Sequence, residues 1–168
     1  TASFRKLMNQ DQTWVSIQVA IGIDKIFRSE SKPDVFLLFS LFKLLQMKDS
    51  FETYHTNLLM KRIKRNNYEV LASDIILIDQ IRSYCNDVYT KRFDSIIENA
   101  DFSKKAFLAF QDEFEVPRCF KVYLYHSNLM PFQNNFECNL PSVMSIISDQ
   151  YFAFLRDRFP NRKYEWSI

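Results

Sequence analysis

Hydrophobic positions along the chain predict helices through its first two thirds. Apolar residues recur there every three or four positions, which is the spacing of one face of an α-helix. Short polar or proline-containing breaks separate the periodic segments. The pattern predicts helices over about 11–27, 33–47, 48–65, 68–85, 90–99 and 103–114, and a last helix that opens at Pro141.

Each helix is expected to turn its apolar stripe toward a core. The second helix is apolar on both faces, so we expect it to be buried on most sides. Side chains that can end helices support the boundaries: the expected N-terminal caps are Asp11 or Thr13, Pro33 at a first helical position, Asp49 with Glu52, Thr90, and Ser103. The expected inward stripes are Trp14, Ile17, Ile21 and Ile26; Phe51, Tyr54, His55, Leu58, Leu59 and Ile63; Leu77, Ile78, Ile81, Tyr84 and Cys85; and Ile147, Tyr151, Phe154, Leu155 and Phe159.

The period changes after Val116-Pro117. The stretch "CFKVYLYH" alternates apolar and polar or aromatic residues, which predicts a strand over Cys119–Tyr125, and "RKYEWSI" is typical of the start of a second strand. We therefore predict a mainly α protein: a helical bundle over 1–115 followed by the start of a small α/β subdomain over 116–168. Because the chain stops in what reads as the middle of a strand, we expect it to be part of a longer protein.

Composition limits the function. Hydrophobic residues make up 47% of the chain, and 17 phenylalanines provide for a substantial core. With one glycine, Gly22, a glycine-rich phosphate cradle is nearly excluded. The net charge of +2 is too mild to indicate nucleic acid by bulk charge. There is no signal-peptide pattern, and Lys43 interrupts the longest apolar run, so we expect no membrane span.

Candidate chemistry is sparse. Cys85, Cys119 and Cys138 are odd in number and widely spaced, so we expect reduced, buried thiols of a nuclear or cytosolic protein. Neither His55 nor His126 has a neighbour at metal-ligand spacing, and His55 is expected to be packed in the bundle. We expect no catalytic residues, no metal and no cofactor.

The end of the third helix carries four cations in five residues. Helical spacing spreads them around the axis, so Arg62 is expected to pair with an acid inside the bundle, while Lys61, Lys64 and Arg65 face solvent. Cations are favourable at this end of a helix, so a solvated terminus explains the group as well as a docking surface does. A nucleic-acid surface is disfavoured because no stacking aromatics are interleaved.

Three motifs, in order, resemble the cullin family. "KDSFETYHTNLLMKRIKR" resembles the family's K-D-x-F-x-x-Y-(Y/H)-x-x-x-L-x-K-R-L helix, "CNDVYTKRFDSIIENADFS" its C-G-x-x-(F/Y)-T-x-K-L segment, and "FPNRKYEW" its H-S-G-R-K-L-x-W. The chain departs from the family where Asn86 and Asn161 replace glycines and Met130 replaces a tryptophan. The matching residues are Lys48, Asp49, Phe51, Tyr54, His55, Leu59, Lys61, Arg62 and Ile63; Cys85, Tyr89, Thr90, Arg92, Phe93 and Ser103; and Arg162, Lys163 and Trp166.

The resemblance implies a function without an active site. A cullin is the scaffold of a multisubunit E3 ubiquitin ligase in the nucleus or cytoplasm. A RING-box protein adds a strand to its α/β part and brings the E2 ubiquitin-conjugating enzyme, and a substrate adaptor binds the N-terminal region. A cullin-like subunit of the anaphase-promoting complex, or a plain helical protein-interaction domain, are the alternatives. The resemblance assigns RING binding to Phe120, Val122, Tyr123, Leu124, Arg162, Lys163 and Trp166, and docking of an acidic E2 tail to Lys61, Lys64 and Arg65.

Overall fold

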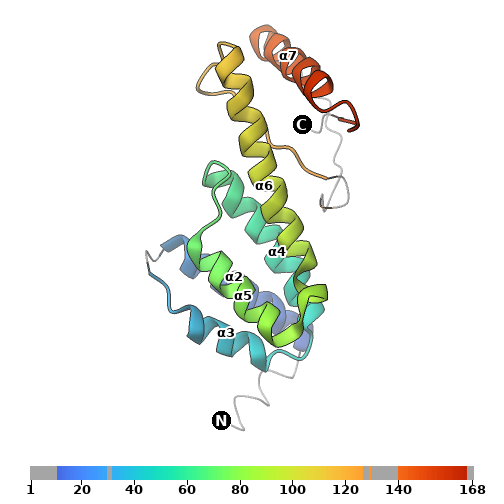
Figure 1. Cartoon of the computed structure of the whole chain (residues 1–168). Coiled ribbons are helices and arrows are strands. Elements are labelled where there is room, and N and C mark those ends of the chain that lie inside the picture. The colour runs from blue at the N-terminus through green and yellow to red at the C-terminus, as the bar shows by residue number, and fades with distance from the viewer. Residues whose placement is uncertain (1–10, 30–31, 127–128, 130–139, 166–168) are drawn as a thin grey trace. The chain divides into compact units, whose positions relative to one another are not determined.

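The structure is a computed structural model that describes residues 11–29, 32–126, 129 and 140–165. Its regular elements in these ranges are all α-helices (Figure 1). This agrees with the predicted mainly helical class, and all six of these helices begin within about four residues of a predicted start. The helices are α2 (Gln12–Ser29), α3 (Val35–Leu44), α4 (Lys48–Arg65), α5 (Ala72–Cys85), α6 (Asp87–Glu113) and α7 (Ser142–Arg158).

The chain divides into two compact units. The first is Thr1–Ala100 and the second Asp101–Ile168, so the boundary falls within α6. The predicted division was into a helical bundle over 1–115 and a subdomain over 116–168. It stays a prediction, because a compact unit of the structure is not the same as an independently folding domain.

In the first unit, α2 packs mainly against α4, and α3 packs against α5. The predicted stripe of α4 is largely confirmed, since Phe51, His55, Leu59 and Ile63 are all buried, although Tyr54 is exposed. In α5, Leu77, Ile78 and Ile81 are buried as predicted, whereas Tyr84 is exposed and Cys85 half-buried. The α4 stripe could be predicted because one apolar face contrasts with a polar and charged one, whereas α5 also exposes the apolar side chains Ile75 and Ile76.

The predicted inward face of α2 is only partly right. Trp14 is 57% exposed, whereas Ile17, Ile21 and Ile26 are half-buried. The most buried positions of the helix are instead Ser16, Ala20, Ile23 and Phe27. The difference amounts to a rotation of the helix about its axis. Because apolar residues lie on more than half of the circumference of α2, spacing alone did not select the face that α4 covers.

The expectation that the second helix is buried on most sides is also wrong. Val35, Leu38 and Phe42 are buried, but Phe36 is 73% exposed and Leu37 is 59% exposed. In the part of the chain that the structure describes, α3 is therefore covered on one face. Asp34 caps it, since its carboxylate accepts a hydrogen bond from the Leu37 N–H at 3.1 Å.

One long helix replaces two predicted ones. α6 runs without a break through residues 100–102, where the sequence had indicated a boundary. Thr90 and Ser103, interpreted as caps, lie inside it and are buried. Of two other predicted caps, one is confirmed: Asp11 caps α2 by accepting a hydrogen bond from the Trp14 N–H at 3.0 Å. The other is wrong, because α4 has no side-chain cap from Asp49.

The predicted α/β subdomain is not shown. Residues 119–126 carry no strand, which corrects the strand predicted over Cys119–Tyr125, and α7 follows with Ile147, Tyr151, Phe154 and Leu155 buried as expected. An alternating segment becomes a strand only when another strand pairs with it. The second predicted strand lies partly outside the described residues, at 166–168.

Candidate functional site

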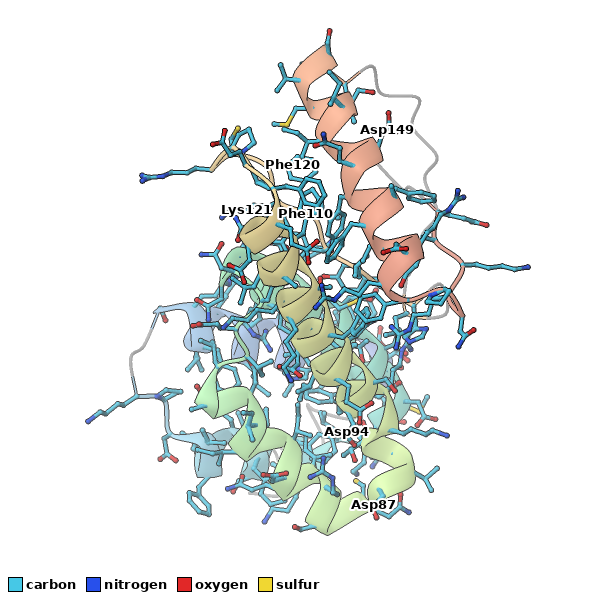
Figure 2. All side chains as sticks on the ribbon, turned by 45° about the horizontal axis from the view of Figure 1, so that its top comes forward. Asp87, Asp94, Phe110, Phe120, Lys121 and Asp149 are labelled. Carbon is cyan, nitrogen blue, oxygen red and sulfur yellow. The ribbon has the colours of Figure 1, made fainter. Side chains whose placement is uncertain are left out.

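The predicted RING-binding segment is anchored in the core of the second unit. Phe120 and Val122 are 7% and 8% exposed, while Lys121 between them is exposed. The alternation seen in the sequence is therefore kept in the burial of residues 120–122, but Tyr123, Leu124 and Tyr125 are all half-buried. The Phe120 ring lies 6.4 Å from that of Phe107 on α6, in the same aromatic cluster as Phe110 (Figure 2). The side chains predicted to bind the partner are thus partly used inside the chain.

A side chain of α6 holds the backbone of this segment. The Ser103 hydroxyl oxygen accepts a hydrogen bond from the Leu124 N–H at 2.9 Å, and Ser103 is 1% exposed. Tyr123 and Leu124 are half-buried. Burial raises the pKa of the Tyr123 and Tyr125 hydroxyl groups, so both stay protonated at neutral pH. The segment therefore has a defined position without strand pairing.

The second group of predicted RING-binding residues lies after α7. The guanidinium of Arg162 stacks on the Phe102 ring at 4.0 Å, and the Phe102 and Phe159 rings lie 5.0 Å apart. Lys163 is exposed. Arg162 thus has an internal packing partner on α6, which sequence spacing did not indicate. Trp166 lies outside the described residues.

The basic end of α4 divides as the sequence predicted. Lys61, Lys64 and Arg65 are exposed, and partial burial lowers the pKa of Lys64. Arg62 points inward and is 3% exposed. Its guanidinium binds two buried carboxylates, Asp24 of α2 at 2.6 Å and Asp74 of α5 at 2.5 Å. This ion cluster joins three helices and leaves three cations on the surface.

His55 is a packed side chain in the core of the first unit and is not placed for a catalytic role. Its ring stacks on Phe51 at 5.0 Å and meets Phe93 edge-on at 5.6 Å. Neither ring nitrogen has a hydrogen-bond partner among the residues that the structure describes. Burial, with a smaller contribution from the Arg62 charge, lowers the pKa of His55 well below its usual value of 6.5, so the ring is neutral.

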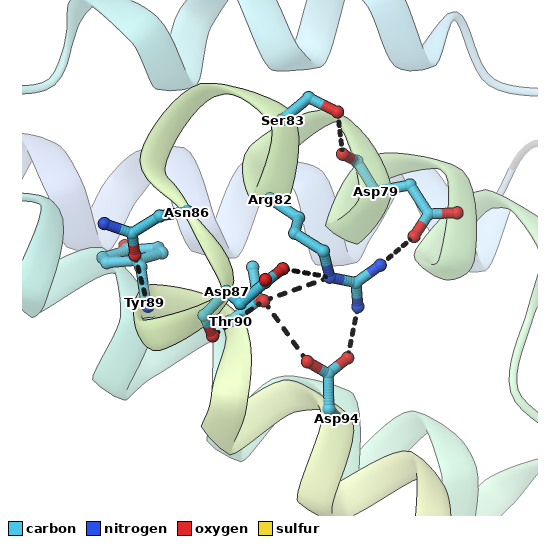
Figure 3. A network of polar contacts seen from close by, with 8 residues as sticks. All are labelled: Asp79, Arg82, Ser83, Asn86, Asp87, Tyr89, Thr90 and Asp94. Carbon is cyan, nitrogen blue, oxygen red and sulfur yellow. Dashed lines mark hydrogen bonds and ion pairs between the residues drawn. The ribbon is translucent and has the colours of Figure 1, made fainter.

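A polar network that the sequence did not predict joins α5 to α6. Arg82 contacts Asp79, Asp87 and Asp94, and its Nε donates to the Thr90 hydroxyl at 3.3 Å (Figure 3). Thr90, one of the residues that match the cullin motif, is fully buried here. The signal that could have found the network is the i, i+3 spacing of Asp79 and Arg82 together with the i, i+4 spacing of Thr90 and Asp94.

Other expectations concern reactive groups. Cys119 is exposed and Cys85 half-buried, so the expectation of buried thiols is wrong for Cys119, and Cys138 lies outside the described residues. Within the described ranges no cluster of three His, Cys, Asp or Glu residues could hold a metal ion. Among these residues there is also no helix with the length and apolarity needed to cross a membrane.

Comparisons with known proteins point to one family. No protein-family model matches the chain. Cullin-3B of Arabidopsis thaliana is 22% identical over 97% of this chain and 23% of its own length. Cullin-3 of Dictyostelium discoideum is 22% identical over 82% of the chain, and Cullin-4 of Caenorhabditis elegans 23% identical over 75%. The chain spans less than a quarter of the length of these relatives.

Proposed function

We propose that this chain, a divergent relative of the cullins, is part of the scaffold of a cullin-RING E3 ubiquitin ligase. The observation that carries the proposal is the similarity to several cullins over most of the chain, at 22% to 23% identity. At such low identity, proteins that share an architecture keep similar residues mainly at buried, packed positions. The motif residues fit this, because Phe51, His55, Leu59 and Arg62 are all buried in the first unit.

We further propose that a RING-box protein binds the second unit at residues 119–126. Phe120 and Val122 are held in the chain's own core, and the Ser103 hydroxyl holds the Leu124 N–H. A segment fixed on one side in this way offers a positioned backbone to which a partner can add a strand. On this view Phe120 and Val122 position the edge, while Tyr123, Leu124 and Lys163 are nearer the partner.

The direct test is recovery of the complex. The full-length protein, tagged, would be co-expressed with its cognate RING subunit and purified, and mass spectrometry would ask whether the small RING subunit is present. Val122→Asp places a charge in the core of the second unit, which costs several kcal/mol if it is unpaired. We expect the variant to lose the RING subunit.

Arg118→Asp is the matched control, because it introduces the same carboxylate at an exposed position just before the proposed interface. It should retain the RING subunit. Circular dichroism of both variants distinguishes loss of the interface from loss of the whole fold. Equal recovery from wild type and Val122→Asp, with both folded, contradicts the proposed interface, and absence of any RING subunit from the wild-type complex contradicts the proposed function.

The scaffold is proposed to be non-catalytic. The packing of His55 between two aromatic rings explains that residue without chemistry. The E2 enzyme, carried by the RING subunit, would supply the reactive thioester, and an adaptor would bring the substrate. We propose that Lys61, Lys64 and Arg65 guide the acidic tail of the E2, and that the complex acts in the nucleus or cytoplasm.

A further inference from the structure

An exposed face of the first unit combines aliphatic side chains with carboxylates. It is formed by α5 and by the part of α6 up to Glu98, which belongs to the first unit. Val88, at the start of α6, is 82% exposed, more than any other large apolar side chain that the structure describes. Ile75 and Ile76 of α5 are also exposed. We refer to this surface as the α5/α6 face.

Helical spacing places Ile75 on the same side of α5 as charged residues. Ile75, Asp79 and Arg82 are at positions i, i+4 and i+7 of α5, so they share one stripe. Arg82 contacts Asp94 of α6 at 2.5 Å, so this stripe lies beside α6 (Figure 3). One stripe of α6 carries charged residues at i, i+4, i+7 and i+11, namely Asp87, Lys91, Asp94 and Glu98.

Negative charge exceeds positive charge on the α5/α6 face. Arg92 of α6 does not change the balance, because it lies 3.8 Å from Glu52 of α4. Asp74 of α5 does not change it either, because it is buried and bound by Arg62. Four carboxylates and two cations remain, which gives a net charge of −2: Asp79, Asp87, Asp94 and Glu98 against Arg82 and Lys91. A cationic partner would complement this face.

The carboxylates around Arg82 keep free capacity for hydrogen bonds. The Arg82 guanidinium donates to Asp79, to Asp94 at 2.5 Å and to the Thr90 hydroxyl at 3.3 Å. Asp87 lies 3.7 Å from it, and its side chain is 90% exposed. An ionised carboxylate can accept at about four positions. Asp79 and Asp87, both exposed, can therefore bind further cations.

Two physical effects favour a cationic occupant. Asp94 and Glu98 are like charges one turn apart on α6, and their repulsion disfavours the helix until a cation lies between them. The Arg82 contacts also fix Asp79 and Asp94 before a partner arrives (Figure 3). Binding therefore loses little side-chain entropy at these two carboxylates.

We propose that the α5/α6 face binds a lysine- or arginine-rich segment of a partner protein that also carries aliphatic side chains. Its cations bind Asp79, Asp87 and Glu98, and its aliphatic side chains cover Ile75 and Val88. The proposal does not depend on the ligase function, since it uses neither the segment after α6 nor the basic end of α4.

The test uses the whole chain and three synthetic peptides. From Asp87 to Glu98 the α6 stripe is about 16 Å long at a rise of 1.5 Å per residue, which about 12 residues cover even as a helix. The first peptide carries lysines and leucines, the second has glutamates in place of the lysines, and the third has serines in place of the leucines. Fluorescence anisotropy of the labelled peptides, across a salt series, measures affinity. We expect saturable, salt-sensitive binding of the first peptide, weaker binding of the third and none of the second.

A charge-reversed variant locates the acidic part of the site. Asp87→Lys combined with Glu98→Lys should weaken binding of the lysine peptide about tenfold at low salt. The same variant should now bind the glutamate peptide. Asp112→Lys combined with Glu115→Lys is the matched control, because it changes the net charge equally at exposed positions of the second unit. It should keep the wild-type preference for the lysine peptide.

A second variant tests the aliphatic side chains. Ile75→Ser combined with Val88→Ser changes two exposed positions, so the fold should be kept, and circular dichroism checks this. It should weaken binding of the leucine-containing lysine peptide severalfold and leave the serine peptide unaffected. Leu37→Ser, at an exposed apolar position of α3, is the control and should leave both affinities unchanged.

Three outcomes would overturn the proposal. The first is equal affinity for the lysine and glutamate peptides, or no binding of either up to about 1 mM. The second is an equal loss of affinity in the charge-reversed variant and its control, which would assign the attraction to net charge. The third is a wild-type dimer in solution that Asp87→Lys with Glu98→Lys converts to a monomer, which would assign the face to a second copy of this chain.

Discussion

His55 and Arg62 are both buried on α4, but Arg62 is charged and His55 is neutral. Arg62 keeps its charge because Asp24 and Asp74 bind it at 2.6 Å and 2.5 Å. His55 has no such partner and is held neutral between aromatic rings. Removing one partner of a buried ion cluster typically costs about 3–5 kcal/mol, so Asp24→Ala should destabilise the first unit strongly.

The neutral state of His55 predicts a pH-dependent stability. Its pKa in the folded chain is lowered, so between that pKa and about 6.5 the unfolded chain binds a proton that the folded chain does not. The free energy of unfolding therefore decreases as the pH falls below about 6.5, by up to about 1.4 kcal/mol per pH unit. Urea unfolding at pH 7.5, 6.5 and 5.5 measures the slope.

His55→Leu should remove this slope while keeping an apolar side chain of similar size against Phe51. His126, which is exposed, provides the matched control. His126→Asn should leave the pH dependence as it is in the wild type. A slope that persists in His55→Leu would show that another group is responsible.

Asn86 combines two functions at the junction of α5 and α6. Its φ of 111° is in the region that favours glycine. Its side-chain oxygen accepts a hydrogen bond from the Tyr89 N–H at 3.1 Å, as an N-terminal cap does (Figure 3). Asn86 stands where the cullin motif has a glycine. Its N–H donates the last hydrogen bond of α5, to the Arg82 carbonyl at 2.9 Å, and the capping of α6 by its side chain was not foreseen from the sequence.

Substitutions at Asn86 should therefore separate backbone from side chain. Asn86→Ala loses the cap and keeps the strained φ, so we expect a loss of about 1–2 kcal/mol in the free energy of unfolding. Asn86→Gly loses the cap but relaxes the backbone, and should lie within about 0.5 kcal/mol of the wild type. Thermal and urea unfolding compare the two. Equal losses from both substitutions would mean that the backbone conformation costs nothing.

At the scale of elements, α6 shows where local signals fail. Thr90 and Ser103 have the side chains of helix caps and precede apolar runs, so the sequence predicts two helices. Both hydroxyl groups are instead used in tertiary contacts, Thr90 with Arg82 and Ser103 with the Leu124 N–H. A buried serine inside a helix and a serine at its start look alike in sequence, because the distinguishing partner is distant along the chain.

The Ser103 contact predicts how firmly residues 119–126 are held. Ser103→Ala leaves the partly buried Leu124 N–H without this acceptor, at a cost of about 1–2 kcal/mol. Ser95 is the matched control on the same helix, since its hydroxyl donates to the Lys91 carbonyl one turn earlier, within α6 itself. Amide hydrogen exchange should become faster at Leu124 in Ser103→Ala and remain unchanged in Ser95→Ala. Unchanged exchange in both variants would contradict an anchoring role for Ser103.

At the scale of the whole molecule, the sequence predicted features that one segment determines and missed those that need a second segment. The class, most helices and the division of the α4 cations follow from local spacing, and the structure confirms them. The exposed face of α3, the burial of Ser16 and Ala20, and the stacking of Arg162 on Phe102 depend on which surfaces meet. The strand at 119–125 was predicted from alternation, but alternation fixes burial and leaves pairing to a partner.

The surface cations of α4 give the last prediction, and it concerns encounter between whole molecules. Lys61, Lys64 and Arg65 are exposed, so their field reaches into solvent and is screened over a Debye length of about 8 Å at physiological ionic strength. If the cluster attracts an acidic tail, it acts mainly on the association rate. Stopped-flow association of an acidic-tailed E2 with the assembled ligase, across a salt series, measures this. Changing all three to Glu should lower the rate at low salt and flatten its salt dependence. Changing the exposed Lys32, Lys43 and Lys91 to Glu alters net charge equally and should have a smaller effect. If the two triple variants behave alike, bulk charge explains the attraction, and the α4 cations only terminate a helix.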